Sequence, residues 1–169
     1  MKNFKMKEFE CRCRCGMPET AKVNIEAMVL NVLDPVRDSF GAPIKVNSGY
    51  RCKKHNAEVG GAFQSQHLCQ GDSAAADIAA ESRGCENMKA WKEANKMIGG
   101  LIIKNGKFDQ LILENVGEHD LLPTWIHVSF RRGGGNRGQV LKKIAGKKGY
   151  VALTGEEIAS LLGPRFKAK

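Results

Sequence analysis

Three residues that lie far apart in the sequence carry side chains that could bind one metal ion. His67 lies in the polar stretch SQHLCQGDS, Asp77 ends the run AAAD, and His127 lies within WIHVSF. Two imidazoles and a carboxylate form a borderline-soft ligand set that suits zinc and leaves a fourth position for water. A single histidine on a strand is more often a structural hydrogen-bonding residue, so the hypothesis requires all three to meet.

The alternation of apolar and polar residues predicts which way two of the relevant segments face. In residues 125–130, every second residue is apolar, and His127 falls on the opposite face, beside Trp125 and Ser129. In residues 109–114, Leu111 and Leu113 form the apolar face and leave Glu114 on the other. If the two strands pair as a hairpin with their apolar faces inward, His127 and Glu114 share one polar face.

The remaining pattern predicts the elements that must position these side chains. Residues 17–40 are expected to be helical, with a break or second start at Pro35 and an end at Gly41. A strand over 43–46, a polar turn over 47–51 and a helical turn over 55–59 follow, and residues 74–80 suit a buried strand.

The second half of the chain contains both helix and strand patterns. Residues 85–98 are predicted to be a helix, with an inner side formed by Met88, Trp91, Met97 and Ile98. Strands are expected over 108–114 and 125–130, and a loop over 132–138. A capping box of Thr154 and Glu157 predicts a last helix through Leu162, stopped by Gly163 and Pro164. The sequence therefore predicts an α+β fold, with helices packed on a small, mostly antiparallel sheet.

Length and charge restrict the class of protein. With 169 residues, we expect a single domain over 1–169, with a cysteine-rich lead over 1–16 and a basic C-terminal segment over 131–169. No apolar run approaches the roughly 18 residues that a membrane span needs, and the first residues lack the apolar core of a signal peptide. We therefore expect synthesis in the cytoplasm. The net charge of +9 favours a polyanionic partner such as nucleic acid, an anionic cell wall or a membrane surface, or it forms a solvated basic face.

Six cysteines lie in the sequence, and none of them form a CxxC pair. In the segment CRCRC, an extended backbone would project Cys11, Cys13 and Cys15 from one side. They could hold a structural metal with help from elsewhere, or one could form a disulfide with Cys52 or Cys69. Without a signal peptide, reduced thiols are the expected state.

Several short motifs, taken in order, resemble the M15 family of zinc D,D-peptidases. They are SGYR at 48–51, Asn56, VGGA at 59–62, S-x-H at 65–67, AADI at 75–78 and WIHVSF at 125–130. The segments FDQLILE at 108–114 and GGNRGQVL at 134–141 resemble its D-alanyl-D-alanine carboxypeptidase branch, which includes phage and bacterial enzymes that cut the cell wall. The similarity extends over roughly residues 4 to 150 and implies the Hedgehog-like zinc peptidase fold.

The resemblance also implies roles for individual residues. His67, Asp77 and His127 would be the ligands of one catalytic Zn²⁺. Arg51 would engage the substrate carboxylate or the developing oxyanion, for which its planar guanidinium is suited. Ser48, Tyr50, Ser65 and Trp125 are expected to support the loop and to bind substrate.

The sequence departs from the family pattern in two places. Asp77 follows His67 by ten positions, three more than is usual, although a longer loop costs little. Asp72 is a rival ligand, but its Gly-Asp-Ser context is typical of a turn. Many members carry an acid three residues before the last histidine, where this chain has Thr124. Glu114 is the expected replacement as general base. Glu118, His119 and Asp120 are fallback candidates.

The resemblance therefore predicts a zinc metallopeptidase that cuts peptide bonds next to D-amino acids in the peptidoglycan stem peptide. It would act on the bacterial cell wall, either as a carboxypeptidase or as an endolysin-type endopeptidase, and we expect a monomer. One alternative is a zinc-containing peptidoglycan-binding module with weakened catalysis. A nucleic-acid-binding protein is a weaker alternative, because aromatic residues make up only 7% of the chain and no helix-turn-helix is apparent.

Overall fold

A computed structural model describes residues 1–163 of the chain. Its helices are α1 (Glu19–Met28), α2 (Asp34–Phe40), α3 (Lys53–Glu58), α4 (Met88–Asn105) and α5 (Gly155–Leu162). Shorter helical turns are η1 (Met6–Phe9), η2 (Val29–Leu33) and η3 (Gln66–Leu68). None of the helices in residues 1–163 is long and apolar enough to cross a membrane.

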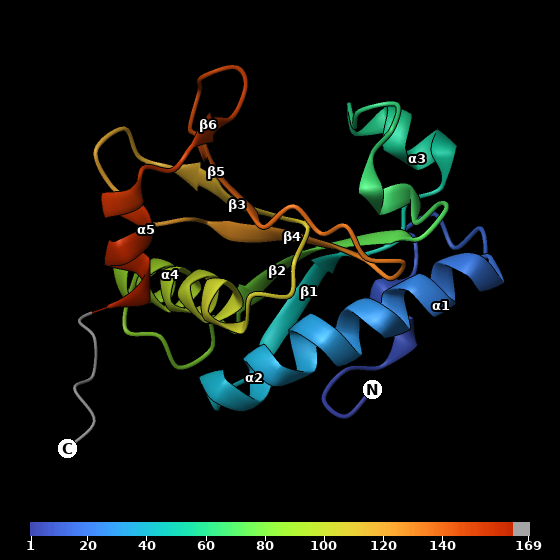
Figure 1. Cartoon of the computed structure of the whole chain (residues 1–169), viewed down its shortest axis with the longest axis horizontal. Helices are drawn as coiled ribbons and strands as arrows, with labels where there is room; N and C mark the ends of the chain where they lie inside the picture. Colours follow the sequence, from blue (N-terminus) through green and yellow to red (C-terminus); the bar gives the residue numbers. More distant parts are fainter. Residues whose placement is uncertain (164–169) are drawn as a thin grey trace.

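The strands of the described residues form one mixed, mostly antiparallel sheet (Figure 1). They are β1 (Ile44–Ser48), β2 (Ser73–Ala80), β3 (Gln110–Val116), β4 (Trp125–Arg131), β5 (Gln139–Ile144) and β6 (Val151–Ala152), in the order β1-β2-β4-β3-β5-β6. Strands β3 and β5 are parallel, and the other pairs are antiparallel. The predicted α+β class is confirmed.

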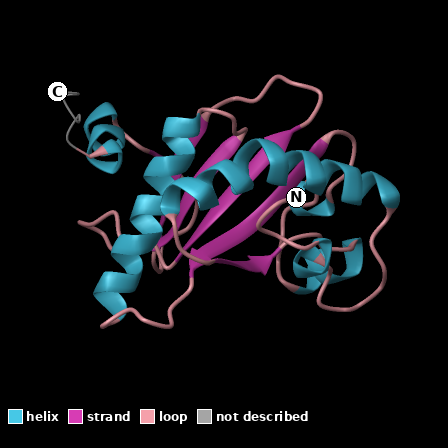
Figure 2. Cartoon of the chain, turned by 90° about the horizontal axis from the view of Figure 1, so that it is seen from below, coloured by secondary structure: helices cyan, strands magenta, loops and turns pink. Residues whose placement is uncertain are grey.

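The longer helices cover one face of the sheet. In Figure 2, α1, α2 and α4 cross in front of the strands. The strand residues that face them are fully buried: Ala74, Ala76, Ile78, Leu111, Leu113, Ile126 and Val128. Burying this apolar area is the main stabilising contribution to the fold. The alternate residues of the same strands, among them Asp77 and His127, therefore point to the opposite face.

The first predicted helix is continuous in the structure. Its three parts, α1, η2 and α2, run from Glu19 to Phe40, and one π-helical stretch precedes the proline. Pro35 lies in the first turn of α2, where its missing N–H group is tolerated. Gly41 ends the helix in the left-handed conformation (φ 72°). The expected break or second start at Pro35 is therefore wrong, because the backbone stays helical through it, whereas the expected end at Gly41 is confirmed.

Helix α4 differs from its prediction in both length and orientation. It begins at Met88 and extends to Asn105, beyond the predicted end at Ile98. The sequence places Gly99 and Gly100 after Ile98, and two glycines normally weaken a helix. Here they permit close packing: a Cβ atom on Gly100 would lie 2.2 Å from the carbonyl oxygen of Leu161 in α5.

The prediction for the inner side of α4 is half wrong. Ile98 is fully buried and Trp91 packs against the core, but Met88 and Met97 are 63% and 57% exposed. The helix buries the face that carries Asn95, Ile98 and Ile102. Asn95 donates to the carbonyl oxygens of Pro123 and Thr124 and so ties α4 to the loop before β4.

The other elements follow the prediction closely, apart from β5, the short strand β6 and the turns η1 and η3, which were not predicted. The loop over 132–138 and the capping box of Thr154 and Glu157 are confirmed, and α5 ends at Leu162 with Gly163 as its cap. Pro164 lies outside the described residues. Strand β5 was not predicted, because Lys142 and Lys143 interrupt its apolar pattern.

An ion pair between the buried Asp109 and the half-exposed Arg137 holds the loop before β5 against the sheet. The side chain of Asp109 is 1% exposed and accepts three hydrogen bonds from Arg137, two from the guanidinium and one from the backbone N–H. Burial alone would raise the pKa of Asp109, but the hydrogen bonds from Arg137 outweigh it and lower the pKa to about 2. Asp109 also accepts a hydrogen bond from Gln66, the residue before His67.

Candidate metal centre and cleft

Two of the candidate ligands meet because β2 and β4 pair in register. Asp77 in β2 lies directly opposite His127 in β4. Both side chains leave the sheet on the face away from α1 and α4, since their neighbours Ile78, Ile126 and Val128 face the core. The Nδ1 atom of His127 lies 3.0 Å from Oδ1 of Asp77. The predicted parity of β4 is therefore confirmed.

The third candidate, His67, comes from η3, and backbone groups hold it in place. Ser65 caps this turn by accepting a hydrogen bond from the backbone N–H of His67. The carbonyl oxygen of Gly49 lies 2.7 Å from Nδ1 of His67. Because a carbonyl only accepts, Nδ1 carries the proton, and Nε2 presents a free lone pair to the other two residues.

The three ligand atoms have the spacing of one face of a tetrahedron. His67 Nε2 lies 3.2 Å from Asp77 Oδ1 and 3.2 Å from His127 Nδ1. Ligand atoms about 2.0–2.1 Å from a tetrahedral zinc ion are separated by about 3.3 Å. A side chain that is 3% exposed (His67) and one that is 9% exposed (Asp77) thus direct acceptor atoms at one point. This group could hold a metal ion.

The electrostatics of the centre favour the forms of the side chains that bind metals. Burial of Asp77 would by itself raise its pKa, but the close approach of His127 and His67 outweighs burial and lowers it. Burial of His127 lowers its pKa, although Asp77 opposes this effect. At neutral pH, Asp77 is therefore a carboxylate and His127 a neutral imidazole, as metal binding requires.

Arg51 holds the second oxygen of the Asp77 carboxylate. Its Nη2 atom lies 2.5 Å from Asp77 Oδ2, and its Nε donates to Ser48 Oγ at 2.9 Å. Asp77 Oδ1 is thus left to face the two histidines. A guanidinium has five N–H donors, so Arg51 retains donors for a further partner.

A cleft of about 310 Å³ opens beside this centre. It is lined by Arg12, Asn47, Ser48, Arg51, His55, Val59, Asp77 and Trp125. Three of the residues expected from the sequence, Ser48, Arg51 and Trp125, therefore lie together with the carboxylate of Asp77. Arg12 and His55 were not expected here. Arg12 belongs to the CRCRC segment, and no local sequence pattern predicts that this segment packs against β1. The guanidinium of Arg12 donates a hydrogen bond to the carbonyl oxygen of Asn47.

Glu114 lies on the same face of the sheet as His127. In the pairing of β3 with β4, Ile112 is opposite His127 and Glu114 is opposite Trp125. Burial raises the pKa of Glu114, and Asp77 adds to this effect, whereas His127, Lys143 and Arg51 oppose it. These interactions place the carboxylate within electrostatic reach of the candidate metal centre.

Two residues near Glu114 were missed by the sequence reasoning. Lys143, on β5, lies 5.7 Å from the centre of the Tyr150 ring. Burial raises the pKa of Tyr150, and the charges of Glu114 and Asp77 raise it further. A prediction of strand β5 would have indicated both residues, because this strand places Lys143 and the following turn next to β3.

Other predicted residues lie away from the cleft. Tyr50 is buried and lines a neighbouring cavity of about 310 Å³ with Ser48. Ser65 lines a larger cavity of about 750 Å³ between α3 and the start of β2. In the structure, the Ser65 side chain caps the turn that carries His67.

The rival ligand and the fallback bases are also separate from the metal group. Asp72 pairs with Arg131 at 3.7 Å, as its turn context predicts. Glu118 pairs with Lys147, and Asp120 accepts hydrogen bonds from the backbone of its own loop. Thr124 bonds to Asn115 through its hydroxyl group. Among the described strand residues, Glu114 lies on the face that carries His127, together with the candidate ligand Asp77.

Comparison with known families agrees with this geometry. The sequence profile described as peptidase M15 matches residues 2–109. The chain belongs to the peptidase M15 family. The residues matched in this M15 peptidase include Arg51, His67 and Asp77, while Glu114 and His127 lie beyond the matched range. No curated protein matches the sequence. Zinc, the metal typical of M15 peptidases, fits the donor set of this centre.

Proposed function

We propose that this M15 peptidase is a zinc-dependent enzyme that hydrolyses bonds next to D-amino acids in peptidoglycan stem peptides. The observation that carries the proposal is the convergence of His67 Nε2, Asp77 Oδ1 and His127 Nδ1 within 3.2 Å of one another, beside an open cleft. Three protein ligands leave one coordination position for water or substrate, as in catalytic rather than structural zinc sites.

The cleft favours a substrate that carries a carboxylate. Two arginines, Arg12 and Arg51, line it, and the chain has a net charge of +9. Stem peptides end in a carboxylate, so a positive cleft attracts and orients them. With its remaining donors, Arg51 binds that carboxylate or the oxygen that becomes negative during attack on the scissile carbonyl.

The zinc ion and several residues of the chain have separate roles in the proposed reaction. When bound, zinc supplies Lewis acidity, which activates water and polarises a carbonyl group. Glu114 accepts the proton of the attacking water and delivers it to the leaving amine. Trp125 forms an apolar wall of the cleft, and Ser48 holds the arginine in its orientation. In this proposal the protein acts on the bacterial cell wall after synthesis in the cytoplasm.

Digestion of purified peptidoglycan tests the proposal. Zinc-loaded protein should create new peptide ends that mass spectrometry identifies: free D-alanine for a carboxypeptidase, or new stem-peptide termini for an endopeptidase. His127→Ala should abolish the products. His119→Ala is the matched control and should retain them, because His119 is an exposed loop histidine. If the wild-type protein binds zinc at His67, Asp77 and His127 but forms no new ends, a peptidoglycan-binding role replaces the proposed enzyme.

A further inference from the structure

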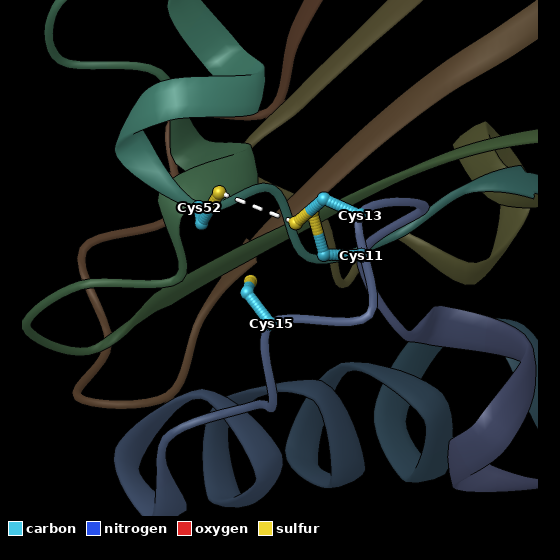
Figure 3. Close-up of side chains that lie close together, drawn as sticks. All are labelled: Cys11, Cys13, Cys15 and Cys52. Carbon is cyan, nitrogen blue, oxygen red and sulfur yellow. Dashed lines mark hydrogen bonds between the residues drawn. The ribbon is translucent and has the colours of Figure 1, made fainter.

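Four cysteine side chains from two separate segments meet at the surface, outside the centre described above. Cys11, Cys13 and Cys15 belong to the lead before α1, and Cys52 caps the start of α3. Figure 3 shows the thiols directed toward a common point between the lead and α3. Their sulfur atoms all lie within 4.8 Å of one another.

The spacing of these sulfur atoms is not that of a disulfide. Cys11 Sγ lies 3.1 Å from Cys13 Sγ, which lies 3.5 Å from Cys52 Sγ, and all four thiols are free. A disulfide requires a separation of about 2.05 Å. In a tetrahedral site with zinc–sulfur bonds of about 2.3 Å, the sulfur atoms are about 3.8 Å apart. These two pairs are about 0.3–0.7 Å shorter than this value, and all pairs lie within 4.8 Å, so small side-chain rotations would suffice to surround an ion.

We propose that Cys11, Cys13, Cys15 and Cys52 bind a second, structural zinc ion. Four thiolates close a tetrahedral site and leave no position for water, which is the arrangement of structural rather than catalytic zinc. The spacing of the four cysteines is C-x-C-x-C followed by one distant cysteine, so the proposed site contains no CxxC pair. Zinc with four thiolates carries two negative charges, and Arg12, Arg14 and Lys53 directly flank the cysteines.

The site would fix a segment that has little regular structure of its own. Residues 10–18 form turns and irregular backbone, and Arg14 adopts a positive φ of 54°. Next to them, the carbonyl oxygen of Phe9 accepts a hydrogen bond from the backbone N–H of Tyr50 at 2.8 Å. The backbone N–H of His55 approaches Cys52 Sγ at 3.4 Å, a contact that stabilises a thiolate.

The proposed ion would also support the candidate catalytic centre. Cys52 directly follows Arg51, and Gly49 supplies the carbonyl group that orients His67. The lead contributes Arg12 to the cleft. Binding of zinc by Cys52 and the lead therefore holds together the loop and the segment that line the cleft on one side. The role of this ion is positioning, and its presence does not depend on the proposed catalysis.

Metal content of matched variants tests the proposal. By elemental analysis, the wild-type protein should contain two zinc ions per chain. His67→Ala combined with His127→Ala should retain one, and Cys13→Ser combined with Cys52→Ser should also retain one. Cys85→Ser should retain both, because Cys85 lies outside the cluster. A histidine double variant that folds and contains no zinc would overturn the proposal.

Two further measurements test it if a variant does not fold. X-ray absorption at the zinc edge of the wild-type protein should show sulfur neighbours for about half of the zinc. Absence of zinc–sulfur scattering would refute the site. Intact-mass analysis without reductant should show six free thiols after chelation. A disulfide among Cys11, Cys13, Cys15 and Cys52 in freshly purified protein would likewise refute it.

Discussion

The replacement Glu114→Gln separates catalysis from metal binding. Ile112 lies opposite His127 and Glu114 lies two residues further along β3, so Glu114 and His127 are diagonal neighbours on one face. Such neighbours are about 7–8 Å apart. A glutamate side chain and one water molecule span this distance, so the carboxylate can take a proton from water in the cleft without being a metal ligand. The amide keeps the shape and removes the base.

The size of the expected effect follows from this role. General acid–base catalysis contributes about 10²–10⁴-fold to the rate, equivalent to about 3–5 kcal/mol of activation free energy. We expect kcat to fall by this factor and KM to change little, because Glu114 is assigned to proton transfer rather than to substrate binding. The zinc bound by His67, Asp77 and His127 should remain.

Although Glu114→Gln should lower kcat, it should maintain or raise the thermal stability of the metal-free protein. Burial raises the pKa of Glu114, so the folded state favours the protonated acid. Stability from this group is therefore highest below the unfolded pKa and is lost as the pH rises through the folded pKa. At neutral pH the carboxylate destabilises the fold, and the amide does not. The Tm of metal-free Glu114→Gln should equal or exceed that of the wild type.

The assay combines turnover of a synthetic stem peptide, zinc content and thermal unfolding on the same sample. Glu118→Gln provides a comparison, since Glu118 is an exposed acid in the loop before β4 that pairs with Lys147. Wild-type turnover in Glu114→Gln would refute its assignment as the base. Loss of zinc together with turnover would show that Glu114 supports the metal instead.

Three further changes test the surroundings of the centre. Arg51→Lys should lower kcat/KM about 10–100-fold, because a lysine cannot replace the paired hydrogen bonds of the guanidinium; steady-state kinetics measures this. Gly49→Ala should destabilise the fold by about 1–3 kcal/mol, since a Cβ atom would lie 2.6 Å from Cα of Phe9. Gly155→Ala is the control and should not destabilise the fold, because its Cβ atom would meet nothing within 4 Å. Thermal unfolding compares the two variants. Asp109→Asn should cost about 2 kcal/mol at pH 7. Because the pKa of Asp109 is lowered to about 2, that difference should disappear as the pH falls from about 4 toward 2 in unfolding measurements across pH.

Much of the candidate site could be predicted because it depends on strand parity. Alternation alone put His127 and Glu114 on one face, and the pairing of β3 with β4 confirms this. The context of AADI placed Asp77 on the adjacent strand, whose register brings it opposite His127. Local patterns were sufficient for the direction of these side chains because it has a fixed period of two in a strand. The assignment of His67 and Asp77 as partners of His127 in one metal site rested on the family resemblance.

The features that were missed depend on contacts between distant segments. Gly99 and Gly100 resemble a helix end, yet α4 continues through them, and the backbone of Leu161 approaches Gly100 too closely for a side chain. Strand β5 contains two lysines, and its pairing with β3 on one side and β6 on the other stabilises it. The meeting of Cys52 with the CRCRC segment depends on how the lead folds back on the loop after β1. No sequence period encodes such contacts.

Zinc-edge anomalous diffraction from crystals of the zinc-loaded protein would locate the metal ion itself. We expect an anomalous peak about 2.0–2.2 Å from His67 Nε2, Asp77 Oδ1 and His127 Nδ1, with a fourth position open to the cleft. A crystal in which these three side chains point apart, or in which no zinc lies between them, would contradict this expectation.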